Sequence, residues 1–125
     1  MTDTANALRL NLDGTLTTID IGTTRREQTR RIGRALLGSA EAVDYIDRPG
    51  TTAVVALAPL IRNHQPVNSH AAHAIHTIAQ TLPHTFHGPV LLIGYTDDGH
   101  MVSLPDDIAA QLRNLVTCPH ASPTR

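Results

Sequence analysis

The sequence contains no lysine, no tryptophan and a single cysteine, Cys118. Without lysine, Schiff-base chemistry, a lysine general base and the phosphate-binding loop whose lysine reaches the terminal phosphates are excluded. One cysteine excludes an internal disulfide and any zinc or iron–sulfur site built from several cysteines. The aromatic residues are Tyr45, Phe86 and Tyr95, too few for a platform on which single-stranded nucleic acid stacks. We therefore expect a protein without a cofactor.

A strong charge of one sign and long apolar runs are also absent. Ten arginines and eleven acidic residues leave a net charge of −1, which disfavours non-specific binding of DNA by the whole surface. No apolar run approaches the roughly 18 residues of a membrane span, and the start MTDTANA is unlike a signal peptide. We expect a cytoplasmic protein without membrane contact. Its 125 residues predict one globular domain over 1–118 and a flexible C-terminal tail over 119–125.

Turn residues and hydrophobic periodicity predict elements in the order ββαββαββα. Asp-Gly pairs predict hairpin turns near 13–14 and 97–99. Thr24 followed by Glu27 predicts a capping box for a helix over 25–37. A second helix is predicted from Asn68 or Ser69 to about Leu82, and a third begins at Pro105. The remaining predicted strands lie at 42–47, 51–57, 89–95 and 101–104, and the continuously apolar second of these predicts burial on both faces.

This order of elements predicts an α+β fold of two layers. The helices are expected to cover one face of a mostly antiparallel sheet. Omitting the first strand and the last strand and helix leaves β-α-β-β-α-β, the split order of ferredoxin-like folds. A ferredoxin-like core is therefore expected. Exposed edge strands at the ends of such a sheet also favour a homodimer formed by strand pairing.

The predicted first helix carries a ladder of arginines. Arg26, Arg30 and Arg34 are four residues apart and share the face opposite to Ile32, with Arg31 on the flank. Guanidinium groups one turn apart match phosphates or the carboxylates of a partner, although a solvated helix face is the more ordinary explanation. No zinc finger, basic zipper or clear helix-turn-helix accompanies the ladder.

Histidines form the other conspicuous group. His70, His73 and His76 follow one another at intervals of three, which turns each 60° further around the second helix. Three such ligands cannot converge on one metal ion without help from another element, so exposed histidines are expected and no metal site is predicted. No Gly-x-Ser-x-Gly motif is present, and no catalytic residue is predicted.

Three segments of the chain resemble a small family known as domain of unknown function 3846, found in bacteria, their phages and their plasmids. They are LGSAEAV at 37–43, QPVNSHAA at 65–72, and HGPVLLIG at 87–94 followed by Asp97-Asp98-Gly99 and Ser103-Leu104. Relatives often carry an acidic segment after the fourth strand, whereas this chain reads ALAPLIR at 56–62. Asn68 is retained, and its ordinary role is that of a helix N-cap. The resemblance implies this architecture and a mobile genetic element, but no activity.

These observations predict a non-enzymatic accessory protein, encoded by or derived from a phage or plasmid, that binds a protein or a small anionic ligand. The expected binding residues are Arg26, Arg30, Arg31, Arg34 and Asn68, with the loop over 59–68. The alternative is weak nucleic-acid binding through the arginine-rich first helix, by a dimer because one copy offers too few contacts. A hydrolase or metal enzyme built from the histidines is a third hypothesis, which the missing carboxylates between Arg48 and Asp97 disfavour.

Overall fold

The computed structural model describes residues 5–36, 38, 40–46, 52–59, 65–79, 85–96 and 98–117. The predicted C-terminal tail, most of the predicted loop after Pro59 and the predicted end of the second helix at 80–82 lie outside these residues. No helix among the described residues combines the length and the apolar character that crossing a bilayer requires.

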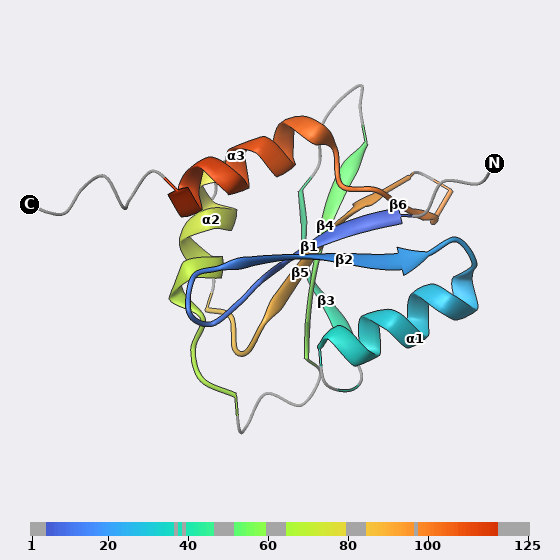
Figure 1. Cartoon of the computed structure of the whole chain (residues 1–125), viewed down its shortest axis with the longest axis horizontal. Coiled ribbons are helices and arrows are strands. Elements are labelled where there is room, and N and C mark those ends of the chain that lie inside the picture. The colour runs from blue at the N-terminus through green and yellow to red at the C-terminus, as the bar shows by residue number, and fades with distance from the viewer. Residues whose placement is uncertain are drawn as a thin grey trace, which may run out of the picture.

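The described residues form strands and helices in the predicted order (Figure 1). The strands predicted at 42–47, 51–57 and 89–95 lie within two residues of their predicted positions, and the last strand is shorter than predicted. The elements are β1 (Ala5–Leu10), β2 (Leu16–Gly22), α1 (Arg25–Ala35), β3 (Ala40–Ile46), β4 (Ala53–Pro59), α2 (Ser69–Ala79), β5 (Val90–Tyr95), β6 (Met101–Val102) and α3 (Asp106–Thr117). Both predicted hairpins, β1–β2 and β5–β6, are antiparallel pairs.

The sheet confirms the α+β class and is antiparallel at every pairing of described strands. Its order is β2-β1-β5-β4-β3, and β6 pairs with the end of β5. A ferredoxin-like core would place a single strand between β2 and β3, the two strands that α1 connects. Three strands lie between them instead, because β1 folds back on β2 as a local hairpin and β1 pairs with β5. The sheet therefore differs from the ferredoxin-like order.

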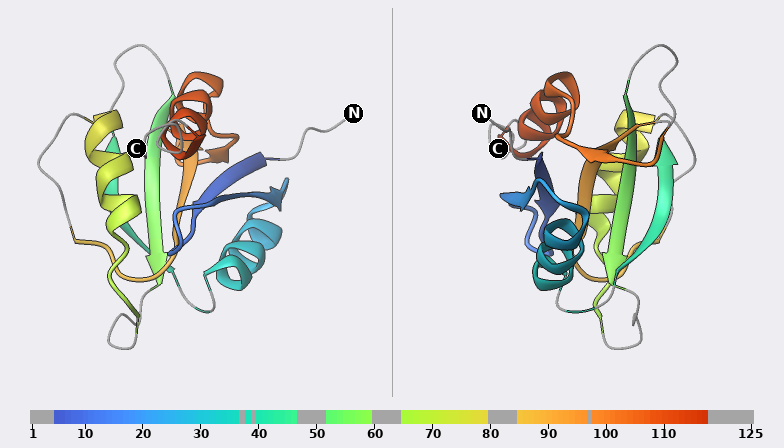
Figure 2. Two further views of the ribbon diagram at one scale, coloured as in Figure 1. Left: turned by 60° about the vertical axis from the view of Figure 1, so that its left-hand side comes forward. Right: turned by 90° about the vertical axis from the view of Figure 1, so that its right-hand side faces the viewer.

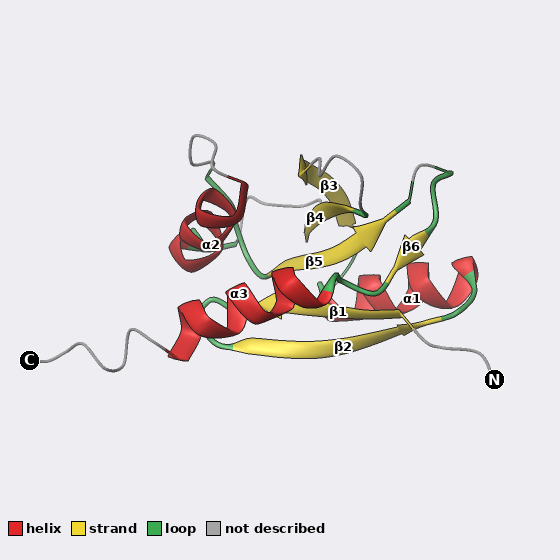
Figure 3. Ribbon diagram, turned by 90° about the horizontal axis from the view of Figure 1, so that it is seen from above, coloured by secondary structure: helices red, strands yellow, loops and turns green. Residues whose placement is uncertain are grey.

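Two separate apolar cores lie on the two faces of the sheet. On one face α2 and α3 pack over Leu8, Ala56 and Leu92, and on the other α1 packs over Ala7, Leu57 and Leu91. Figure 2 shows α1 and α2 on opposite sides of the strands, and Figure 1 shows α3 above and α1 below β1 and β2; Figure 3 looks down on the α3 side. The sequence predicted all helices on one face, and α1 departs from this expectation.

Strand β4 supplies both cores, as its sequence predicted. Val54, Ala56 and Ala58 belong to the core under α2 and α3, whereas Val55 and Leu57 belong to the core under α1. Each of these side chains is at most 6% exposed. Because successive residues of a strand point to opposite faces, a continuously apolar strand must be covered from both sides.

The predicted capping box begins α1. The hydroxyl of Thr24 accepts a hydrogen bond from the N–H of Glu27 at 3.1 Å, and the Glu27 carboxylate accepts one from the N–H of Thr24 at 3.4 Å. Hydrogen bonds from the backbone N–H groups of Thr23 and Thr24 hold the pKa of Glu27 below its usual value, with a smaller contribution from Arg31. The start of α1 is thereby set by residues adjacent in the sequence.

Candidate functional site

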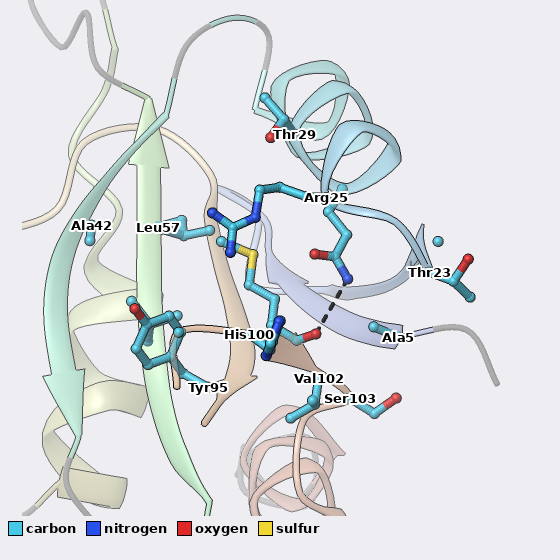
Figure 4. Close-up of a pocket in the computed structure, with 15 residues that line it drawn as sticks. Ala5, Thr23, Arg25, Thr29, Ala42, Leu57, Tyr95, His100, Val102 and Ser103 are labelled. Atoms are coloured by element: carbon cyan, nitrogen blue, oxygen red, sulfur yellow. Dashed lines mark hydrogen bonds between the residues drawn. The ribbon is translucent and has the colours of Figure 1, made fainter. Parts of the chain in front are cut away.

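A cavity of about 640 Å³ lies between the first turns of α1, the surface of the sheet and the β5–β6 hairpin (Figure 4). A second cavity of about 610 Å³ continues along α1 toward Gly33 and Gly38. Both are lined by Thr29, Leu57 and Met101. We refer to the two cavities together as the α1 groove.

The groove lies beside α1 because hydrogen bonds among the described residues hold the helix toward β2 and β1. Arg31 donates a hydrogen bond to the carbonyl oxygen of Asp20 on β2 at 3.1 Å, and Arg9 on β1 donates one to the carbonyl oxygen of Ala35 at 3.0 Å. These bonds hold α1 near β2 and β1. The surface of β3 and β4, at Ala42 and Leu57, is left as the floor of the groove.

The third side of the groove is β6, which a glycine brings close to β5. A Cβ atom at Gly94 would lie 2.5 Å from the carbonyl oxygen of Ser103, so no other residue fits without a shift of the backbone. The side-chain amide of Gln28 on α1 donates a hydrogen bond to the carbonyl oxygen of Met101 at 3.3 Å. This bond joins α1 to β6 across the end of the groove.

The polar side chains of the groove carry positive or neutral groups. Arg25 extends from α1 across the groove to Leu57, and Tyr95 and His100 lie toward the β6 end (Figure 4). Arg30 lines the continuation of the groove. None of the described residues that line either cavity is acidic. The groove therefore combines a floor of Val55 and Leu57 with guanidinium groups on its α1 side.

Of the four arginines predicted to bind a ligand, Arg30 lines the groove and Arg31 forms contacts within the fold. Arg26, Arg30 and Arg34 are exposed, as expected, but only Arg30 is among the lining residues. Arg31 forms ion pairs with Asp20 at 3.3 Å and with Glu27 at 3.6 Å. Because its guanidinium connects α1 to β2, a ligand would have to replace these partners.

Asn68, also predicted as a binding residue, is fully buried and fully hydrogen-bonded. Its side-chain amide donates to the carbonyl oxygens of Leu10 at 3.0 Å and Gly88 at 2.9 Å, and its side-chain oxygen accepts from the N–H of Ala71 at 3.0 Å. It caps α2 and joins α2 to β1 and to the segment before β5. It has no polar atom left for a ligand, so the structure assigns it to the fold.

The predicted exposure of His70, His73 and His76 is confirmed. No group of three or more potential metal ligands occurs in the described part of the chain. The ring of His70 lies against Gly14 in the β1–β2 turn, where a Cβ atom would be 3.0 Å from it. At the mouth of the groove Nδ1 of His100 lies 3.2 Å from a carboxylate oxygen of Asp98. A hydrogen bond from the Thr96 hydroxyl, and then the nearby His100, hold the pKa of Asp98 below its usual value.

Sequence reasoning missed Arg25, Tyr95 and His100 as site residues. For Arg25 a signal was present: it precedes Ile32 by seven residues, a spacing that places both on one face of a helix. The inward stripe of α1 thus ends in a charged residue at the first turn. Tyr95 and His100 carried no such signal, because only the pairing of β5 with β6 brings them to α1.

A scan against protein-family models, a search of curated proteins and a search of solved structures found no match to this chain. The groove therefore has to be interpreted from its own geometry.

Proposed function

We propose that this protein is a non-enzymatic accessory protein of a phage or plasmid that binds an anionic, partly apolar ligand in the α1 groove. The resemblance of segments 37–43, 65–72 and 87–94, with 97–99 and 103–104, to the family named above supports the mobile-element setting. The binding role is supported by the shape and chemistry of the groove.

One observation carries the proposal: Arg25 reaches over an apolar floor in a groove whose described lining contains no acidic residue. Val55 and Leu57, which form the floor, are 2% and 6% exposed. A guanidinium offers a planar fork of donors that matches a carboxylate or phosphate. Arg25 itself is exposed, so an anion can reach its guanidinium from solvent.

The polar groups around the groove favour binding over catalysis. The hydroxyl of Ser103 accepts a hydrogen bond from the N–H of Asn6 at 3.0 Å, which connects β6 to β1. The imidazole of His100 is paired with Asp98 in the same turn. Both groups contribute to the β5–β6 hairpin, which supports a structural role for them.

Titration with 1-anilinonaphthalene-8-sulfonate, an apolar anion, tests the proposal through its fluorescence. The matched variants are R25Q/R30Q, which removes the groove arginines, and R34Q/R113Q, which removes two exposed arginines that do not line it. We expect R25Q/R30Q to bind the probe about tenfold more weakly, since each charge contact at a partly exposed site contributes up to about 1 kcal/mol. Equal binding by the wild type and R25Q/R30Q would contradict the proposal.

A second candidate function is favoured by the exposure of Arg26, Arg30 and Arg34. Guanidinium groups one turn apart on a helix suit the phosphates of a nucleic acid. Gel shifts with single- and double-stranded DNA at low and moderate salt test this alternative. It predicts that R26Q/R34Q weakens DNA binding and leaves binding of the fluorescent anion unchanged, so the two functions are separable.

A further inference from the structure

The groove is elongated, which indicates the kind of molecule that fills it. Its lining on α1 runs from Arg25 to Gly33, and at a rise of 1.5 Å per residue this is about 12 Å. A site for a small anion needs no such length. From this shape, and resting on the function proposed above, we infer that the groove binds an extended acidic segment of a partner protein, with an apolar residue between two acidic ones.

The two guanidinium groups of the groove lie in its two cavities. Arg25 lines one cavity and Arg30 lines the other. They are five residues apart on α1, about 7.5 Å along its axis and about 140° around it, so they do not share one face of the helix. In an extended chain, side chains two residues apart are separated by about 6.6 Å. An extended acidic segment that runs along both cavities therefore meets one guanidinium in each.

A narrow floor favours an extended segment over a helix. Val55 and Leu57 are almost completely covered by their neighbours, so the floor offers little apolar surface, less than the broad apolar stripe of a helix would need. Opposite α1 the groove is lined by Ala40 and Ala42. Their small side chains let a peptide backbone approach β3 closely.

Addition of a strand to the free edge of β3 is the less favourable arrangement. The pairing of β3 with β4 shifts register between Ala42 and Asp44. Such a bulge interrupts the regular row of N–H and C=O groups that an added strand needs. The segment is therefore expected to lie in the groove over β3 and β4, held by charge and by one buried side chain.

Fluorescence anisotropy with a labelled hexapeptide of alternating glutamate and leucine tests this inference. Three control ligands leave the protein unchanged. A peptide of alternating glutamate and serine lacks the apolar groups, and one of alternating glutamine and leucine lacks the charges. Glutarate is a small dicarboxylate without a peptide chain. We expect the glutamate–leucine peptide to bind at least tenfold more tightly than the other three. R25Q/R30Q should weaken its binding about tenfold, and R34Q/R113Q less than twofold.

The outcomes separate this inference from the function on which it rests. If the fluorescent anion binds through Arg25 and Arg30 but the glutamate–leucine peptide binds no more tightly than glutarate, the peptide inference is overturned and the proposed function stands. If neither probe depends on these arginines, both fail. Tighter, arginine-dependent binding of a single-stranded DNA 12-mer than of the peptide would also overturn the inference.

Discussion

The two faces of the sheet are built from the same strands but are completed differently. On one face α2 and α3 enclose a core in which Leu92 is fully buried, and the amide of Asn68 has all its partners within the fold. On the other face α1 covers only part of the surface, and a groove with the charged Arg25 remains beside it. The first face is a closed core, and the second keeps a groove beside its helix.

This difference does not arise from the composition of the strands. Val54 and Val55 are neighbours on β4, almost equally buried, and they face opposite cores. What differs is the number of helices on each face and where each helix is attached. Polar bonds from Arg31 and Arg9 hold α1 near β2 and β1, away from β3.

The largest effect is expected from shortening leucines on the two faces. Leu92→Ala should lower the free energy of unfolding by about 3 to 4 kcal/mol, because it leaves a sealed cavity in a packed core. Leu57→Ala should cost about 2 kcal/mol, since this side chain borders the groove and water fills the space it leaves. Urea unfolding measures both values. An equal cost at the two positions would show that the groove is closed in solution.

The next effect concerns Asn68. Asn68→Ala should lower the free energy of unfolding by about 2 to 3 kcal/mol, because the carbonyl oxygens of Leu10 and Gly88 and the N–H of Ala71 lose a buried partner. Ser69→Ala in the same turn is the control and should cost less than about 0.5 kcal/mol, because Ser69 is exposed. The folded Asn68→Ala variant should still bind the fluorescent anion. A loss of this binding would show that Asn68 does belong to the binding site.

A smaller effect is expected at the start of α1. Thr24→Ala removes the hydroxyl that accepts a hydrogen bond from Glu27 and should cost about 1 kcal/mol of stability. Because the first turn of α1 carries Arg25, the affinity for the fluorescent anion should also fall. Calorimetric titration measures this affinity, and thermal unfolding measures the stability. Thr24→Ser keeps the hydroxyl and should behave like the wild type. A loss in Thr24→Ser equal to that in Thr24→Ala would show that the cap is unimportant.

The smallest effect is pH-dependent. The pKa of Glu27 is lowered in the folded protein, so its carboxylate stabilises the fold above the usual glutamate pKa of about 4.3. This contribution is lost as the pH falls through the lowered value. The stability difference between the wild type and Glu27→Gln should therefore be present at pH 7 and disappear in strong acid. Urea unfolding at several pH values measures it, and a difference that is independent of pH would contradict the capping role of the charge.

Local elements were predictable because their determinants are close in the sequence. The Thr24–Glu27 capping box, the Asn68 cap and the two hairpins involve residues within a few positions of one another. The order of the strands was not predictable in this way. The ferredoxin-like sheet and the observed sheet have the same order of elements along the chain. Only the pairing of β1 with β5 distinguishes them.

The candidate site, too, could be predicted from the sequence only in part. Exposed arginines on α1 followed from helical periodicity, and Arg30 does line the groove. That Arg31 is held by Asp20 depends on β2 lying beside α1, and that Asn68 is buried depends on β1 and the segment before β5. These contacts join residues between 11 and 58 positions apart, beyond the range of any periodic pattern.

By itself, the sequence determined the α+β class, the order of its elements and the residues that begin α1 and α2, because propensity and capping act over a few residues. Only the tertiary structure decided on which face α1 lies, that a groove remains beside it, and that Arg25, Tyr95 and His100 line it together. Those features depend on which strands pair, and pairing is settled by the burial of side chains that are far apart in the chain.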